Sequence, residues 1–505
     1  MTARAPAADV CLILEGTYPY VSGGVSNWTH ELLKVHHHLS FHLMMLVPPG
    51  MDLTPLYSIP SNVVGMTVIT LHKIPKGSFS NGRANELLMK LEQPLLRLQS
   101  GGTLGDVTDL LALLMPHKQR LGRWALLDSP AAWNLLTRMY EATLPESSFL
   151  HYFWSWRSLH GALYSVLLAE LPVARTYHAV STGYAGLLAA RAHVETGRPA
   201  LLTEHGIYTN ERRVELSMAD WLFDHLSRRL DVDKANRDLK DIWMDTFLSY
   251  SHACYAACSK IITLYEGNTE FQIRDGAQLE RIVIIPNGVE YERYARIKRA
   301  PAPHPPTIAL IGRVVPIKDT KTFVRTCSIL KEIVPDLRVK IIGPAEENRT
   351  YFQECRVMVG SLGLQDTITF TGKVPLEEHL GSIDVNVLTS LSEAQPLVIL
   401  EAGAAGIPTV ATDVGACREL ILGSSRETPP LGAGGAVTPL GDPTAIAHAI
   451  ARLLKDQAWY DQCCRTIQRR VQVYYNKRDV DEKYRALYES HCAVPDSCCA
   501  FQREH

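Results

Sequence analysis

The pattern of apolar and polar positions in the first part of the chain alternates between two periods. Short apolar runs, such as "DVCLIL" at 9–14 and "FHLMMLV" at 41–47, have the length and composition of buried strands. Segments between such runs, for example 25–36 and 183–195, have the spacing of helices. Strands separated by helices form parallel sheets, so this pattern predicts a doubly wound, Rossmann-like α/β domain. Further strands are expected at 66–71, 174–180, 200–203, 261–264 and 282–285.

Residues 80–170 depart from this alternation, because nearly all of the interval has a helical pattern. Its segments include "NELLMKLEQPLLRLQ" and "AAWNLLTRMYEATL", which are too apolar for a disordered region. The interval therefore predicts a helical insertion in the first domain. It has two open roles, of which the simpler is to cover one edge of the sheet and the other is to bind a partner.

The alternation restarts after a Pro-rich stretch at 301–306, which has the composition of a linker. We therefore expect an N-terminal domain at 1–300, a second Rossmann-like domain at 301–470, and a C-terminal helical segment at 471–505 that packs back on the first domain. Strands of the second domain are expected at 307–312, 338–342, 367–371, 383–388, 408–411 and 434–438, and helices at 319–333, near 350–363, 396–405 and 443–454.

Ligands of open α/β sheets bind at the carboxyl ends of the strands, so two such domains predict a site in a cleft between them. The loop "YPYVSGGVSNW" follows the first strand and leads into a helix that starts near Val25. Gly23 and Gly24 let the backbone approach a phosphate at that helix N-terminus. No Lys-Ser or Lys-Thr follows the glycines, so the positive charge for a phosphate has to come from elsewhere.

Composition narrows the class of protein. The chain has 505 residues and a formal net charge of −2, and this absence of a basic surplus argues against nucleic acid as a partner. No apolar run reaches the roughly 18 residues of a membrane-spanning helix, and "MTARAPAADV" lacks the pattern of a secretory signal. The 11 cysteines have no metal-site spacing, which is typical of thiols in a reducing compartment. We expect a cytoplasmic protein, with a peripheral role at a membrane complex left open.

Two carboxylates stand out in "SEAQPLVILEAGAAGIP". Glu401 is surrounded by apolar and small residues, so its carboxylate has to be hydrogen-bonded, paired or neutralised. Ribose hydroxyls are suitable donors to it. Glu393 precedes a helix for which Pro396 suits the first turn, and the amides of that turn are able to bind an anion. The alternative, which physical arguments alone leave equally open, is a helix cap at Glu393 and a structural ion pair at Glu401.

Two cations favour the first of these interpretations. In "IALIGRVVPIKDTKTFV", Arg313 follows a strand and Lys318 precedes a helix. A lysine at a helix N-terminus is disfavoured by the helix dipole unless an anion binds there. Arginine and lysine together suit a diphosphate.

These segments, together with "VIIPNGVE", resemble the retaining GT-B glycosyltransferases of family GT4. The spacing of Glu393 and Glu401 is similar to the paired-glutamate motif of that family, and the resemblance covers most of the chain outside 80–170. More narrowly, "LILEGTYPYVSGGVSNW", "YHAVSTGYAGLLAA" and "LTEHGIYTNERR" resemble the cytosolic glycosyltransferases of bacterial Pel exopolysaccharide synthesis, which belong to biofilm formation.

The resemblance implies a role for each residue of the donor site. Arg313 and Lys318 would neutralise the donor diphosphate, Glu401 would bind the ribose, and Val374 would lie beside the base. The family requires no metal at the site, so we expect neither a metal nor a cofactor and discount "DVD" at 231–233 and 479–481 as metal ligands. The residues expected to meet the donor sugar and phosphate are Glu393, Ala394, Gln395, Pro396 and Leu397.

In the first domain the resemblance points to His178, at the end of the strand "ARTYHAV". Many GT4 members carry His-x-His there, with one histidine near the donor sugar. This chain has His178-Ala179-Val180, and a satisfied core histidine is the alternative. Glu204 and His205 follow another strand and are candidates for the acceptor side, or else an ordinary cap and a surface charge.

The function that the resemblance implies is transfer of a hexose or N-acetylhexosamine from a UDP-sugar to a growing exopolysaccharide. The anomeric configuration would be retained, and the partners would be the inner-membrane components of the Pel apparatus. Two other classes remain as alternatives. A nucleotide-sugar-binding scaffold without turnover would keep the fold and bind partners. An NAD-dependent oxidoreductase would need a Gly-x-Gly-x-x-Gly turn with an acidic residue about 20 positions on, and neither domain has both.

Overall fold

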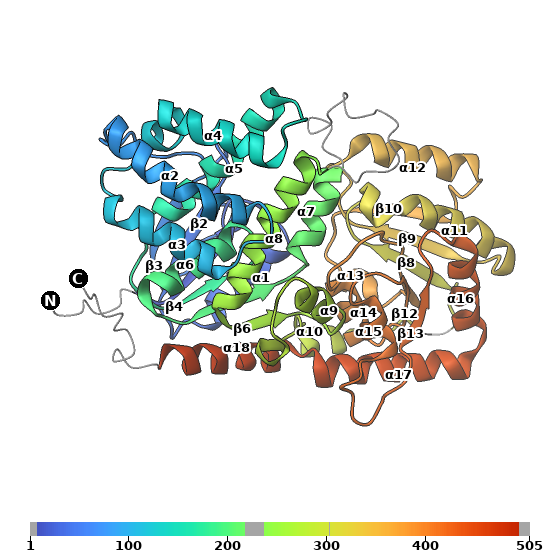
Figure 1. Cartoon of the computed structure of the whole chain (residues 1–505). Helices are drawn as coiled ribbons and strands as arrows, with labels where there is room; N and C mark the ends of the chain where they lie inside the picture. Colours follow the sequence, from blue (N-terminus) through green and yellow to red (C-terminus); the bar gives the residue numbers. More distant parts are fainter. Residues whose placement is uncertain (1–7, 218–236, 302, 494–505) are drawn as a thin grey trace. The chain divides into compact units, whose positions relative to one another are not determined.

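The computed structural model describes residues 8–217, 237–301 and 303–493, which divide into two compact units (Figure 1). The first unit comprises the chain up to Thr263, a segment at 269–283 and the C-terminal part from Arg485. The second unit comprises 264–268 and 284–484. Each unit is built around one parallel sheet with helices on its faces (Figure 1).

The sheet of the first unit has seven strands in the order β3-β2-β1-β4-β5-β6-β7. The pairs β3–β2, β2–β1, β1–β4, β4–β5 and β5–β6 are all parallel. Side chains from Val10 to Leu14 are fully buried, as expected for the central strand of a sheet that is covered on both faces. The strands are β1 (Ala8–Glu15), β2 (Phe41–Val47), β3 (Val63–Thr70), β4 (Ala174–Ala179), β5 (Ala200–Glu204), β6 (Cys258–Thr263) and β7 (Ile282–Ile284).

The helices of the first unit include the predicted insertion, which forms α2 to α5 and packs on the same hydrophobic core as the sheet. They are α1 (Gly24–Val35), α2 (Asn81–Leu98), α3 (Leu104–Leu114), the 3₁₀ turn η1 (Met115–His117), the π-helical turn η2 (Trp124–Asp128), α4 (Pro130–Thr143), α5 (Phe149–Leu168), α6 (Tyr184–Thr196), α7 (Tyr208–Ser217), α8 (Leu239–Ala257), α9 (Gly267–Arg274, which straddles the division between the units) and η4 (Leu279–Arg281).

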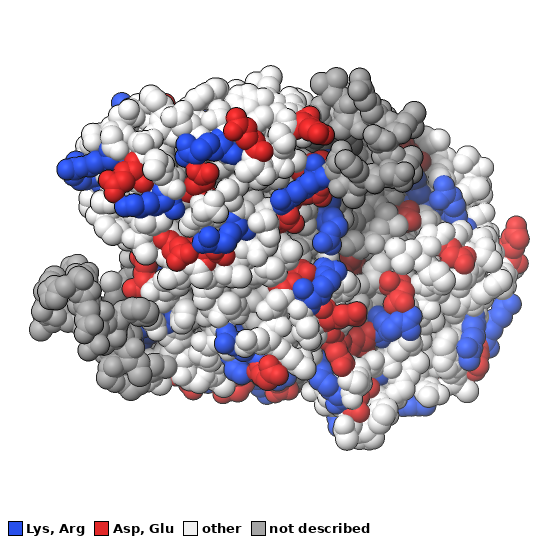
Figure 2. Space-filling view, in the orientation of Figure 1, with Lys and Arg blue, Asp and Glu red and all other residues white. Residues whose placement is uncertain are grey.

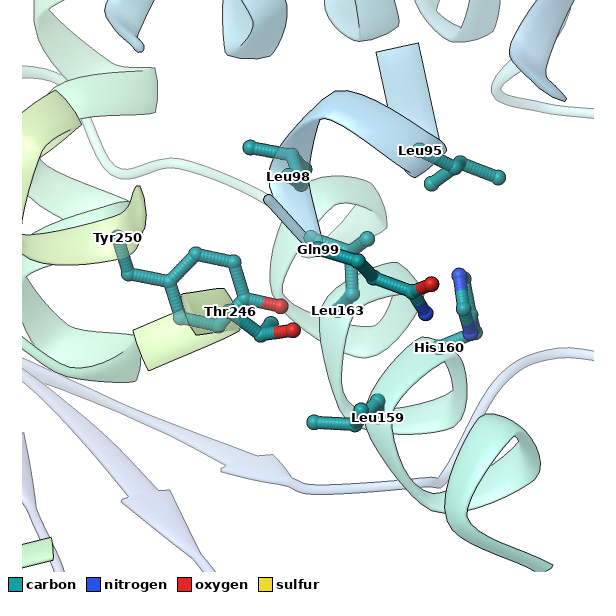
Figure 3. Close-up of a pocket in the computed structure, with 8 residues that line it drawn as sticks. All are labelled: Leu95, Leu98, Gln99, Leu159, His160, Leu163, Thr246 and Tyr250. Carbon is teal, nitrogen blue, oxygen red and sulfur yellow. The ribbon is translucent and has the colours of Figure 1, made fainter. Parts of the chain in front are cut away.

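A small cavity lies where α2, α5 and α8 meet (Figure 3). Its volume of about 10 Å³ has room for a single water molecule. Nδ1 of the buried His160 ring donates to Trp156 O at 2.8 Å, and burial lowers the pKa of His160 to about 4. The cavity is lined by Leu95, Leu98, Gln99, Leu159, His160, Leu163, Thr246 and Tyr250 (Figure 3). Its size and position make it a feature of the helical core and exclude a substrate site.

The sheet of the second unit has six strands in the order β10-β9-β8-β11-β12-β13, and all of its pairs are parallel. The central strands β8 and β11 are neighbours although the helices and strands between them span more than 70 residues of chain. The strands are β8 (Thr307–Ile311), β9 (Arg338–Ile342), β10 (Ile368–Gly372), β11 (Val385–Leu388), β12 (Thr409–Thr412) and β13 (Gly435–Thr438).

Helices cover both faces of this second sheet (Figure 1). The final helix, α18, starts in the second unit and its last turns belong to the first. No helix among the described residues has the length and apolarity needed to cross a membrane. The helices are α10 (Tyr291–Ala295), the 3₁₀ turn η5 (Pro316–Lys318), α11 (Thr320–Ile333), α12 (Arg349–Ser361), α13 (Glu377–Leu380), α14 (Leu397–Ala404), α15 (Cys417–Leu422), α16 (Pro443–Lys455), α17 (Gln457–Tyr474) and α18 (Lys477–Cys492).

A buried ion pair fastens α17 to the loop after α15. Arg470 on α17 is fully buried and pairs with Glu427, which is 6% exposed. Its guanidinium also donates to Ile421 O at 2.8 Å, so the charged group has several acceptors. Breaking one partner of such a pair leaves the other charge buried without compensation.

We expect Arg470→Leu to lower the free energy of unfolding by about 3 to 5 kcal/mol, the cost of stranding the Glu427 carboxylate. The matched control is Arg469→Leu at the neighbouring exposed position, where the side chain donates to Gln472 Oε1 at 2.9 Å. Urea denaturation of both variants measures the difference. Equal stability of the two variants would contradict the structural role assigned to the buried pair.

Candidate functional site

Two loops of the second unit meet at the carboxyl edge of its sheet. One follows β8 and the other follows β11, and these strands are neighbours. Leu391 N donates to Ile317 O at 2.8 Å, which joins the loops through their backbones. The Thr389 hydroxyl also lies 3.0 Å from the carbonyl oxygens of both Lys318 and Asp319. The two segments that the sequence singled out are therefore held together as one surface.

The central contact of this surface is an ion pair between Lys318 and Glu393. The Lys318 ammonium group donates to Glu393 Oε1, and the side chains are 21% and 12% exposed. The Ser390 hydroxyl donates to the same Oε1 atom at 2.6 Å. The Ser390 carbonyl is in turn held by the Thr412 hydroxyl at 2.7 Å. Lys318 and Glu393 were expected at the donor site from the sequence, whereas Ser390 was not. The signal for Ser390 was a hydroxyl residue three positions before a glutamate in a loop.

The backbone after Lys318 turns sharply into α11. Asp319 has a φ of 45°, in the left-handed region, and its carboxylate accepts from Thr322 N at 3.2 Å as the cap of α11. This turn places Lys318 just outside the helix N-terminus, as the sequence predicted.

A third loop, after β12, supports the segment that carries Glu393. Gly415 has a φ of +51°, and a Cβ atom there would lie 2.0 Å from Glu393 O and 2.5 Å from Ala394 O. Next to it, Ala416 N donates to Ala394 O at 2.8 Å. The close approach requires glycine at 415, and it fixes the course of the backbone through Glu393 and Ala394.

The start of α14 lies directly after this segment. Pro396 is the N-cap of α14, and no side chain caps the first turn. Gln395 is buried and accepts from Asn287 N at 2.6 Å. Leu397, the first residue of the helix, is 41% exposed. The first turn of α14 therefore presents backbone N–H groups, an arrangement that favours an anion.

Glu401 lies one turn into α14 and is largely buried. The Tyr294 hydroxyl donates to Glu401 Oε1 at 3.2 Å and is the one hydrogen-bond partner of the carboxylate among the described residues. Burial raises the pKa of Glu401, and the Tyr294 hydrogen bond opposes this rise. The carboxylate has room for additional donors, which hydroxyl groups of a ligand are able to supply.

Two further predicted donor residues lie apart from the Lys318–Glu393 pair. Arg313 is exposed, and its guanidinium lies 2.8 Å from both oxygens of Glu347 in a surface ion pair. Val374 follows β10 and is partly buried against the core that contains Tyr294 and Ile399. The described contacts join neither residue to Lys318.

A larger cavity of the second unit lies at the other edge of the sheet. Its volume is about 560 Å³, and Pro306 and Asp384, which line it, immediately precede β8 and β11. Lys318 and Glu393 follow the same two strands. Because parallel α/β sheets bind their ligands at the carboxyl ends of the strands, we assign the candidate site to the Lys318–Glu393 edge in spite of the larger cavity.

In the first unit, Gly23 and Gly24 begin α1 as predicted. Both are exposed, and a Cβ atom added at either would meet nothing within 4 Å. No side chain caps the helix, and its first turn has no acidic residue. Packing within the unit therefore gives no reason for two glycines here, whereas the approach of a ligand to the backbone would.

A carboxylate that sequence analysis missed lies at the end of β1. Glu15 accepts from the Tyr208 hydroxyl at 3.0 Å and from Ala185 N at 3.0 Å. It thereby connects the end of β1 to the first turns of α6 and α7, the helices that follow β4 and β5. The signal in the sequence was an acidic residue that directly ends a buried strand.

The structure places His178 in the core. It is 0% exposed, with Nδ1 2.7 Å from the Tyr488 hydroxyl on α18 and Nε2 2.9 Å from Thr203 Oγ1. Burial lowers the pKa of His178 to about 3, so the ring is neutral. Its predicted place near a donor sugar stays a prediction, which the observed contacts do not require.

Glu204 and His205 differ in their surroundings. Glu204 is 1% exposed and accepts from the Tyr255 hydroxyl at 2.7 Å and from Gln272 Nε2 at 2.9 Å. Burial raises the pKa of Glu204 to about 7. His205 is partly exposed, its ring centroid lies 4.7 Å from that of Trp28, and burial lowers its pKa to about 4.

Positive and negative side chains are mixed on the visible face of the first unit. Lys and Arg alternate with Asp and Glu over its helices (Figure 2). Many of these charges pair locally, such as Lys90 with Glu86. The described residues on this face therefore form no basic surface of the kind that follows a nucleic-acid backbone.

Solved structures with a similar fold define the fold class of this chain. The chain is similar to HepE from Anabaena in complex with UDP, with a TM-score of 0.56 and 14% identity over 95% of this chain and 99% of that one. It is also similar to sucrose-phosphate synthase from Thermosynechococcus elongatus, with a TM-score of 0.55 and 17% identity over 95% and 98% of the two chains. The two Rossmann-like units therefore form a GT-B fold, which confirms the predicted fold class.

Family models match both units. Residues 8–280, more than half of the chain, match the family described as "Domain of unknown function (DUF3492)", and the chain belongs to that family. Residues 305–456 match the model described as "Glycosyl transferases group 1". The predicted resemblance to GT-B glycosyltransferases of this type is thereby confirmed.

Curated relatives match a part of the chain. One is a D-inositol 3-phosphate glycosyltransferase of Paenarthrobacter aurescens, 34% identical over 152 residues, which are 28% of this chain and 37% of the relative. Another is the lipopolysaccharide core biosynthesis mannosyltransferase LpsB of Rhizobium meliloti, 33% identical over 30% of this chain and 42% of the relative. The chain thus spans well under half the length of these relatives.

The raised pKa of Glu204 predicts a pH dependence of stability. Between about pH 4.5 and 7 the folded chain holds a proton on Glu204 that the unfolded chain releases, so stability falls as the pH rises through this window. Glu204→Gln removes this titration. The free energy of unfolding of the parent chain, relative to the variant, should fall by on the order of 3 kcal/mol across the window and then level off.

Urea denaturation at half-unit pH intervals measures the difference. The control is Glu215→Gln, at an exposed position on α7. A difference between the parent chain and Glu204→Gln that stays constant with pH would show that Glu204 keeps an ordinary pKa in the folded chain.

Proposed function

We propose that the protein is a glycosyltransferase that transfers a hexose or an N-acetylhexosamine from a UDP-sugar. The observation that carries the proposal is the convergence of Lys318, Glu393 and the uncapped start of α14 at the carboxyl edge of the second sheet. This edge lies within the segment that matches the group 1 glycosyl transferases. Solved structures of HepE in complex with UDP and with UDP-glucose support the choice of UDP.

In this proposal the donor diphosphate binds at Lys318, Arg313 and the first amides of α14. Lys318 and Arg313 offer positive charge, and α14 offers N–H groups aligned with its dipole. Arg313 has to leave Glu347 for this, which costs little because that pair is exposed.

The nucleoside binds beside Glu401 and Val374. Burial raises the pKa of Glu401, and hydrogen bonds donated to its carboxylate oppose this rise. Tyr294 supplies one donor, and the two ribose hydroxyls supply the others. Glu393, with the backbone of residues 394–397, meets the sugar.

The chemical step follows from where charge develops. As the bond from the anomeric carbon to the diphosphate breaks, negative charge grows on the leaving oxygen, and Lys318 and Arg313 stabilise it. The same leaving oxygen accepts the proton of the attacking hydroxyl, so attack comes from the face of departure and the configuration is retained. We propose that these two cations carry the charge that a metal would otherwise neutralise.

The acceptor we propose is a growing exopolysaccharide of the Pel type. Support comes from the resemblance of "LILEGTYPYVSGGVSNW" and "LTEHGIYTNERR" to PelF, the cytosolic glycosyltransferase of that system. Its partners would be the Pel components at the inner face of the membrane. Glu204 and His205, at the start of the loop that follows β5, would then lie on the acceptor side.

We expect Lys318→Ala to lower kcat for release of UDP from the donor sugar by about 100-fold or more, and Arg313→Ala by about 10-fold, because each removes a cation from the leaving diphosphate. Lys321→Ala is the matched control, since Lys321 lies on α11 and pairs with Glu354 at the surface. Thermal unfolding checks that all three variants stay folded.

The assay uses UDP-, GDP- and ADP-sugars, with and without EDTA. Full activity of Lys318→Ala would overturn the diphosphate assignment, and loss of activity in EDTA would overturn the metal-free proposal. Binding of a UDP-sugar by the parent chain without any turnover would instead support a scaffold that binds nucleotide sugars.

A further inference from the structure

One oxygen of Glu393 accepts two hydrogen bonds in the ligand-free chain. Lys318 and Ser390 both donate to Oε1, whereas Oε2 accepts no hydrogen bond from the described residues. The two hydrogen bonds to Oε1 thus orient the carboxylate, and Oε2 is able to accept from another donor.

The two donors to Oε1 differ in what they do when a diphosphate arrives. Lys318 carries a full charge on a flexible chain, and a diphosphate attracts it more strongly than a single carboxylate oxygen does. Ser390 is neutral and short, so a phosphate does not draw it away. Its hydrogen bond is the one that is able to persist in the donor complex.

Ser390 is also fixed in place by its surroundings. It is 1% exposed, lies two residues after the end of β11, and has its carbonyl held by Thr412. The hydroxyl of Thr389, the residue before it, lies within hydrogen-bond distance of the carbonyl oxygens of Lys318 and Asp319 and so stabilises the turn there. The hydroxyl of Ser390 therefore has a defined position on a rigid strand end, as a positioning group requires.

We propose that Ser390 is a positioning residue that holds Glu393 toward the donor sugar after Lys318 has turned to the diphosphate; this rests on the proposed function. With Ser390 in place, Glu393 Oε2 points to a sugar hydroxyl while Oε1 stays anchored. Without it, Oε1 loses its anchor once Lys318 has turned to the diphosphate, and Oε2 is no longer held toward the sugar.

The test compares Ser390→Ala with Ser390→Thr, which keeps the hydroxyl, and with Ser392→Ala at the exposed position two residues on. We expect Ser390→Ala to lower kcat with a UDP-sugar by about 10- to 100-fold, because a hydrogen bond to a charged group is lost. Its dissociation constant for UDP alone should change by less than about 3-fold, since UDP does not use Glu393. Ser390→Thr and Ser392→Ala should stay within about 3-fold of the parent chain in both measurements.

The outcomes separate this proposal from the one on which it rests. A parent chain without turnover of any nucleotide sugar overturns the proposed function and this inference with it. An active parent chain together with a fully active Ser390→Ala overturns the positioning role alone. An equal loss of UDP binding and kcat in Ser390→Ala also overturns it, because a purely structural defect would have that signature. If Ser390→Ala does not fold, Ser390→Cys retains the volume with a weaker donor, and its kcat should fall while UDP binding stays.

Discussion

The Glu393 carboxylate joins two loops of the second unit that are far apart in the sequence. It accepts from Lys318, on the loop after β8, and from Ser390, on the loop after β11. Backbone and hydroxyl contacts at Thr389, together with the close approach of Gly415, keep both loops at the same edge of the sheet. A charged site is stable here because Lys318 and Glu393 pair with each other within the unit.

The first unit manages its buried polar groups differently. Glu204, His178 and Glu15 lie at or near the ends of neighbouring strands, and each is satisfied by groups of the same unit. Burial shifts the pKa of Glu204 upward and that of His178 downward, so both tend toward their neutral forms. Such groups couple the loops to the sheet. The contrast with the solvent-accessible Lys318–Glu393 pair explains why the second unit offers the clearer binding surface.

Much of the fold was predictable because both sheets are parallel and covered, which turns their strands into continuous apolar runs. The edge strand β3 is the exception, since it begins three residues before its predicted start. Its exposed side chains Val64, Met66 and Val68 alternate with less exposed ones, so the strand is not a continuous buried run. Helix α8 was missed although Asp238 and Asp241 form a capping box at its start. That signal is local and was available from the sequence.

The site was predictable only as far as residue types reveal it. Lys318, Glu393 and Glu401 stand out because charged groups in such places need an explanation. Ser390 and Glu15 do not, since their importance depends on which strands lie side by side, and β8 and β11 pair across more than 70 residues. In the same way, His178 lies under Tyr488, 310 positions later in the chain. No local pattern contains that contact.

The most direct measurement of the central claim is a crystal structure of the chain with UDP. The account predicts the diphosphate on Lys318 and the first turn of α14, with the ribose hydroxyls on Glu401 and with Glu393 still hydrogen-bonded to Ser390. UDP bound in the larger cavity beside Pro306 and Asp384, with the Lys318–Glu393 pair intact, would contradict it.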